Sequence, residues 1–165
     1  MALLAHCLHQ TKKLNLSQYE YLVVEKVVDK TKKKNTPDYF LEKFQDKLVS
    51  SLKQKNIFIS VDKELKDSIY LDKTLLLRAG VTRYSEGNPA LKMLVGFGAG
   101  SSYLDALVFL VNAKNNSIIG NIKIDKNSWA LGGAIAASQS VDTFLDGSCK
   151  KIASEIEKAK TGISN

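Results

Sequence analysis

The strongest constraint on the fold is a long apolar run that is followed by a turn and a second apolar run. Residues 102–111 carry one charge, Asp105, and show almost no alternation of polar with apolar residues. This pattern predicts a central strand that is covered on both sides. Residues 114–117 are Lys-Asn-Asn-Ser, which favours a turn because asparagine tolerates positive φ. Isoleucines recur over 118–124, so we expect a β-hairpin at this place in the chain.

A helix is predicted to begin at the segment Thr36-Pro37-Asp38 and to run to about Lys55. Thr36 offers an N-cap hydroxyl, Pro37 suits the first helical position, and Asp38 places an acid in the first turn. Apolar side chains then recur at helical spacing, which predicts a core-facing stripe. The stripe consists of Phe40, Leu41, Phe44, Leu48 and Leu52.

Three further strands are predicted before the hairpin. They cover Tyr19–Val28, which is rich in tyrosine and valine, then residues 57–61, and then Thr74–Tyr84. In the last of these the face expected to be buried holds Leu75, Leu77, Ala79 and Val81. The face expected to contact water holds Arg78, Thr82 and Tyr84.

The C-terminal segment is predicted to be a second amphipathic helix that starts near Ser140 and packs on the sheet. Its apolar side consists of Val141, Phe144, Leu145, Cys149, Ile152 and Ile156. Gly147 lies inside this helix, where glycine costs about 1 kcal/mol relative to alanine. We therefore expect Gly147 to allow the close approach of another backbone.

The element order β-α-β-β-β-β-α predicts an α+β fold with one mixed or mainly antiparallel sheet and its helices packed on one face. The chain has 165 residues, which is within the usual size of one domain. We expect a flexible tail over residues 1–18, a remnant of a lipoprotein signal in one interpretation, and a single domain over 19–160.

The net charge of +7 raises the question of an acidic partner. Most of the excess lies in residues 1–66, where Lys30, Lys32, Lys33 and Lys34 form a run. Arg78 and Arg83 are the only arginines, whereas nucleic-acid surfaces favour arginines and exposed aromatics. A solvated loop is the favoured interpretation of the lysine run, and a surface that binds nucleic acid or another polyanion is the alternative.

Two glycine-rich apolar segments are the most conspicuous local features. The first, residues 94–102, lacks the glycine spacing and the following helix of a dinucleotide site, and it lacks the Gly-Lys-Ser/Thr of a phosphate loop. Its glycines can let the backbone approach a neighbour or bend at a strand entry. The second segment, 129–138, is too short to span a bilayer as a helix. The candidate contacts with a partner or a membrane are Leu94, Val95, Gly96, Phe97, Gly98, Gly100, Trp129, Gly132 and Gly133.

Residues that could carry catalysis are few. His6 and His9 are the only histidines and both lie in the tail, where their spacing with Cys7 suits no defined metal site. Cys149 falls on the apolar stripe of the last helix, where a cysteine usually behaves as a small hydrophobic residue. Arg78 and Asp105 are expected to form a structural ion pair across neighbouring strands. We therefore expect no catalytic residue, no metal and no cofactor, and a protein that is not an enzyme.

Several segments resemble a family of domains of unknown function found in small bacterial envelope lipoproteins. The resemblance rests on Gly-Phe-Gly-Ala-Gly-Ser-Ser at 96–102, Leu-Asp-Ala at 104–106, the turn at 112–117, and Trp129 with Gly132-Gly133. It covers roughly residues 19–158. The element order is also distantly similar to the periplasmic domain of the curli-secretion-channel lipoproteins. The family has no established catalytic residues.

The resemblance also implies a cell-envelope location. Members usually carry a signal peptide that ends in a lipidated cysteine, and residues 2–7, Ala-Leu-Leu-Ala-His-Cys, are similar to the end of one. Either the chain begins further upstream and Cys7 is lipidated, or Cys7 is an ordinary tail residue and the start at Met1 is genuine.

The sequence thus predicts a non-enzymatic domain on the periplasmic side of the envelope. It would act in protein interaction, self-association or envelope assembly, and it would lie at a membrane surface if the N-terminus is lipidated. The alternative is a soluble basic cytoplasmic protein that binds nucleic acid or another polyanion. Binding to a polyanion would weaken steeply with salt, because each neutralised phosphate releases counterions.

Overall fold

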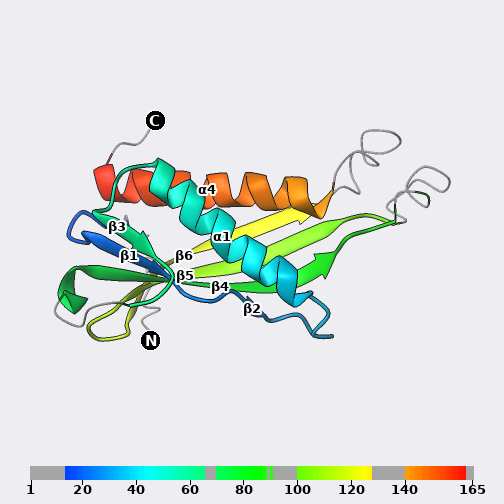
Figure 1. The fold of residues 1–165 in the computed structure, drawn as a ribbon, viewed down its shortest axis with the longest axis horizontal. Helices are drawn as coiled ribbons and strands as arrows, with labels where there is room; N and C mark the ends of the chain where they lie inside the picture. Colours follow the sequence, from blue (N-terminus) through cyan, green and yellow to red (C-terminus); the bar gives the residue numbers. More distant parts are fainter. Residues whose placement is uncertain (1–13, 66–69, 89, 91–99, 128–139, 163–165) are drawn as a thin grey trace, which may run out of the picture.

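One six-stranded mixed sheet carries two helices across one of its faces (Figure 1). The structure is a computed structural model, and it describes residues 14–65, 70–88, 90, 100–127 and 140–162. The strands are β1 (Tyr21–Val24), β2 (Val28–Asp29), β3 (Ser60–Asp62), β4 (Thr74–Ser85), β5 (Tyr103–Asn112) and β6 (Ile118–Asn127). The helices are α1 (Asp38–Gln54), the short 3-10 helix η1 (Leu71–Lys73) and α4 (Val141–Thr161). The predicted α+β class is confirmed.

The sheet has the strand order β3-β1-β4-β5-β6, with β2 placed beside β4. Strand β1 is parallel to β3 and β4, whereas β4, β5 and β6 are antiparallel neighbours. The single strand predicted over 19–28 is divided into β1 and β2, which both pair with β4 at different places along its length. The predicted hairpin is present as β5 and β6.

Helix α1 buries the predicted stripe but begins differently from the prediction. Phe40, Phe44 and Leu48 are buried in the main core. Pro37 takes the N-cap position, and no side chain caps the helix. The predicted N-cap role of Thr36 is therefore wrong: its backbone N–H donates to Asp29 Oδ2 at 2.9 Å, and its hydroxyl caps no N–H of the helix. Thr36 lies one residue too early in the chain to reach the free N–H groups of the first turn.

Strand β4 contains a β-bulge that changes which face its last residues occupy. The register with β5 shifts between Val81 and Arg83, which leaves Thr82 as the extra residue. Tyr84 was predicted to contact water, but it is buried and its ring centroid lies 4.7 Å from that of Phe40. The bulge moves Tyr84 to the helix-covered face. Leu75, Leu77, Ala79 and Val81 occupy that face as predicted.

Strand β5 lies inside the sheet, but it is not covered on both sides as predicted. Its side chains alternate between buried and half-buried, because the helices lie on one face only. Leu104, Ala106, Val108 and Leu110 are buried against the helices. We call the opposite side of the sheet the open face, and it carries Arg78, Tyr103, Leu107, Phe109 and Lys123.

Helix α4 packs on β5, β6 and α1 with its predicted apolar side. The Ser140 hydroxyl caps it by accepting from the Thr143 N–H at 3.2 Å, and Gly162 ends it with a φ of 73°. Cys149 is buried, and burial raises the pKa of its thiol to about 12. The expectation for Gly147 is wrong: a Cβ at this position would meet no atom of another described element within 4 Å. No described helix has the length and apolar character needed to cross a membrane.

Candidate interaction site at the end of the sheet

Three strand ends meet at one end of the sheet, and both glycine-rich segments connect to that end (Figure 1). Ser85 of β4 is paired with Tyr103 of β5, which is paired with Asn127 of β6. The first segment lies between Ser85 and Tyr103, and the second lies between Asn127 and the start of α4. Of the predicted contact residues, Gly100 is described. Leu94, Val95, Gly96, Phe97, Gly98, Trp129, Gly132 and Gly133 lie outside the described residues, as does Cys7.

The backbone is tightly packed where β4 leaves the sheet and β5 enters it. Gly87 has a φ of 74°, and a Cβ at this position would lie 2.4 Å from the carbonyl oxygen of Gly100. That same oxygen accepts a hydrogen bond from the N–H of Asn88 at 2.7 Å. The hydroxyl of Ser102 donates to the carbonyl of Glu86 at 2.7 Å. The close approach therefore depends on Gly87, whose missing side chain leaves room for the carbonyl of Gly100.

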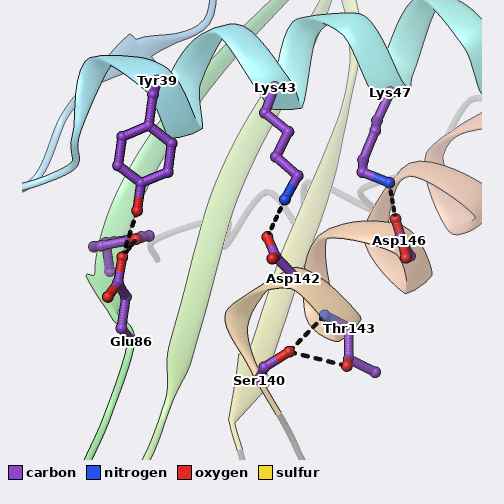
Figure 2. A network of polar contacts seen from close by, with 9 residues as sticks. Tyr39, Lys43, Lys47, Glu86, Ser140, Asp142, Thr143 and Asp146 are labelled. Atoms are coloured by element: carbon purple, nitrogen blue, oxygen red, sulfur yellow. Dashed lines mark hydrogen bonds and ion pairs between the residues drawn. The ribbon is translucent and has the colours of Figure 1, made fainter.

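Glu86 connects this end of the sheet to the start of α1 through Tyr39 (Figure 2). Its Oε1 accepts hydrogen bonds from the hydroxyls of Tyr39 and Tyr84, at 2.6 and 2.7 Å. These bonds lower the pKa of Glu86. The pKa of Tyr84 is raised by burial and by its bond to Glu86, and the pKa of Tyr39 is raised chiefly by its bond to Glu86. At neutral pH the carboxylate is therefore charged and both phenols are neutral, which is the state that keeps the three groups together.

A row of ion pairs joins α1 to α4 beside this cluster (Figure 2). Lys43 contacts Asp142 at 2.7 Å and Lys47 contacts Asp146 at 2.5 Å. The bond to Asp146 raises the pKa of Lys47. Each pair is partly exposed and by itself contributes little to stability. Together they fix the side of α4 that faces α1, and so the position of the helix start that follows the second glycine-rich segment.

The two arginines make different ion pairs from the one predicted. Arg78 lies opposite Phe109 and donates to both carboxylate oxygens of Glu25, at 2.7 and 3.2 Å. Asp105 lies opposite Arg83, with an N–O distance of 3.2 Å. The predicted Arg78–Asp105 pair is therefore wrong, because the antiparallel register separates these residues by four positions along β5. Arg83 also lies over the ring of Tyr103, 4.3 Å from its centroid.

The lysine run lies in the loop between β2 and α1, beside β4. The stem of Lys30 packs over Gly80, and Lys34 Nζ donates to the carbonyl of Asp29 at 2.5 Å. Because both arginines are already paired with carboxylates, these lysines have no neighbouring free arginine that could bind a phosphate in bidentate fashion. The local structure matches a solvated loop better than a nucleic-acid surface.

The described residues at this end of the sheet place their polar side chains in hydrogen bonds and ion pairs. Its charged and phenolic groups are engaged with one another, and Cys149 is a buried thiol whose raised pKa makes it a poor nucleophile. In the described ranges, no group of three or more His, Cys, Asp and Glu side chains could hold a metal ion. Tyr39 and Glu86 are members of this site that were not predicted from the sequence. The Ser-Glu-Gly-Asn-Pro segment at 85–89 has turn composition and was the signal that could have drawn attention to Glu86.

Comparisons with known proteins identify a family and a shared fold. A family model described as a domain of unknown function, DUF4410, matches residues 10–133. No curated protein matches the sequence. Among solved structures, the PelC dodecamer from Paraburkholderia phytofirmans is 12% identical, with coverage of 86% of this chain and 91% of that chain and a TM-score of 0.60. A Xanthomonas campestris protein described by the family model DUF330 is 11% identical, with coverage of 92% of each chain and a TM-score of 0.53. At these identities the likeness shows the fold alone.

Alanine is expected to have opposite effects on stability at Gly87, which contacts Gly100, and at Gly147, which lies in an open position. Gly87→Ala should destabilise the protein by more than about 1 kcal/mol, because the added Cβ meets a carbonyl oxygen and the backbone has positive φ. Gly147→Ala is the matched control and should stabilise it by about 0.5–1 kcal/mol, because this helix position is open. Urea unfolding of both variants measures the effects. Equal effects would contradict the described packing.

The hydrogen bonds to Glu86 predict a pH-dependent contribution to stability. Its folded pKa lies below the ordinary value of 4.5, so the unfolded state binds more protons in the range between the two pKa values. The contribution is therefore present above pH 4.5 and is lost as the pH falls through the folded pKa. Glu86→Gln should lose stability relative to wild type at about pH 7 and lose less at about pH 3 in urea titrations.

Tyr39→Phe is the control for this experiment. It removes one of the two donors and leaves the carboxylate in place. The part of the unfolding free energy that Glu86 contributes at about pH 7 and loses at about pH 3 should therefore become smaller but persist. A difference between wild type and Glu86→Gln that does not change with pH would show that the tyrosine bonds do not stabilise the charged carboxylate.

Proposed function

The chain belongs to the DUF4410 family of domains of unknown function, and on this premise we propose that it is a non-enzymatic domain of the bacterial cell envelope. It works on the periplasmic side, where it binds protein partners in envelope assembly. Its contact surfaces are the two glycine-rich apolar segments, with Phe97 and Trp129 as the largest side chains. A lipid on Cys7 would hold it at a membrane surface.

The observation that carries the interaction role is the arrangement at the end of the sheet. Both glycine-rich segments connect to strand ends that are paired with one another, at Ser85, Tyr103 and Asn127. The bonds of Glu86 to Tyr39 and Tyr84 and the ion pairs between α1 and α4 hold the surrounding elements. A site whose flanks are fixed loses less entropy when it binds than one whose flanks must also become ordered.

The shared fold supports an assembly of several copies. The fold neighbour PelC is described as a dodecamer, at 12% identity to this chain. A fold can host many functions, so this support is an analogy. It makes a second copy of this chain one of the partners that the proposal includes.

The proposal is tested by site-specific photo-crosslinking in cells that express the gene with its natural upstream sequence. A photoreactive amino acid at Phe97 or Trp129 should give discrete adducts with envelope proteins or with a second copy, recovered from the envelope fraction. The matched control is Tyr70, an exposed aromatic residue beside η1, and it should give few adducts. Equal crosslinking at all three positions, or recovery of the chain in the cytoplasmic fraction, would contradict the proposal.

A further inference from the structure

A groove of about 470 Å³ runs along the outer flank of α1 and is acidic in a chain that is basic overall. Asp38, Glu42 and Asp46 line it from α1, and Glu64 lines it from the segment after β3. Two lysines also line it, which leaves a net charge of −2. One of them, Lys63, is already paired with Asp46.

The acids of α1 are spaced so that they repel one another. Residues four apart on a helix are neighbours, and like charges at this spacing each cost a few tenths of a kcal/mol. Asp38 and Glu42 are both exposed and make no ion pair with another described residue. Between them and the sheet lie the apolar side chains of Val27 and Leu41. A groove with an apolar floor and a carboxylate rim matches a lysine side chain, which has an aliphatic stem and a charged end.

The opposite edge of the same sheet carries two lysines and one acid, Asp125, which gives it a net charge of +1. It is formed by β6, a strand of ten residues that pairs only with β5 among the described elements. Lys123 lies on the open face of the sheet and Lys126 on the helix-covered face. Neither lysine makes an ion pair with another described residue. Lys151 is exposed on the flank of α4 that faces away from Asp146, the residue that contacts α1.

We propose that the acidic groove of one copy receives the β6 edge of a second copy, with Lys123 reaching Glu42. This inference rests on the proposed interaction function and names one partner and its two surfaces. The groove and the β6 edge lie at opposite ends of the strand order, so the contact is head-to-tail. Each added copy presents a new groove and a new edge, which permits a closed ring or a longer array and not only a dimer.

Charge reversal on the two surfaces tests the contact. In sedimentation velocity of the full chain, wild type should form species larger than a dimer that dissociate as salt is raised. Glu42→Lys and Lys123→Glu should each weaken association by about tenfold or more, because like charges then face each other. An equimolar mixture of the two variants should assemble again, and so should a chain that carries both substitutions.

Matched controls carry the same charge changes elsewhere. Asp72→Lys on η1 and Lys114→Glu in the turn between β5 and β6 are exposed and belong to neither surface, and both should associate as wild type does. Circular dichroism of every variant verifies that it is folded. Association of Lys123→Glu that matches that of Lys114→Glu would overturn the head-to-tail contact, and so would a mixture that does not assemble.

The two proposals can fail separately. A wild-type chain that stays monomeric at high concentration and low salt would overturn the contact between copies, whatever the crosslinking at Phe97 and Trp129 shows. Loss of all crosslinks at those positions, with salt-dependent assembly intact, would overturn the role of the glycine-rich segments. A β6 edge that binds polyanions instead, with no self-association, would also contradict the inference.

Discussion

The backbone pairing of β4 is the interaction on which the rest of the structure depends. This strand of twelve residues pairs with β1, β2 and β5, so it joins the parallel half of the sheet to the antiparallel half. Its bulge at Thr82 then decides which side chains meet at the end of the sheet. If Thr82 were an ordinary paired residue and not a bulge, Tyr84 would lie on the open face, and it could not pack on Phe40 or donate to Glu86.

The one-sided covering of the sheet determines which surfaces are left for other molecules. Both helices lie on the same face, and the ion pairs between them fix their relative position. This leaves an acidic groove outside α1, an edge at β6 that carries two lysines and one acid, and an end where three strands terminate together. The proposed functions use these surfaces, and none of them requires a reactive group.

The hairpin, both helices and the fold class could be predicted from the sequence, because each depends on the period of apolar residues within one segment. The errors arose where a contact depends on register. The bulge turns the side chain of Tyr84 to the helix-covered face, and the pairing of β5 with β4 separates Arg78 from Asp105. No described helix covers the open face, so β5 is buried on one side and half-buried on the other. Gly147 shows the same limit, since a close approach depends on what lies opposite. The cluster around Glu86 joins α1 to the end of β4. Its members are far apart in the sequence, so no local sequence pattern predicts that they are in contact.

Hydrogen–deuterium exchange at low and high protein concentration tests most directly whether the two edges of the sheet meet in an assembly. At high concentration we expect slower exchange in two separate regions together, residues 38–46 of the groove and residues 118–126 of β6, because the unpaired backbone of the edge strand becomes covered. Exchange on the paired interior of β5 should not change. Protection of only one of the two regions, or none at any concentration, would contradict a head-to-tail contact between copies.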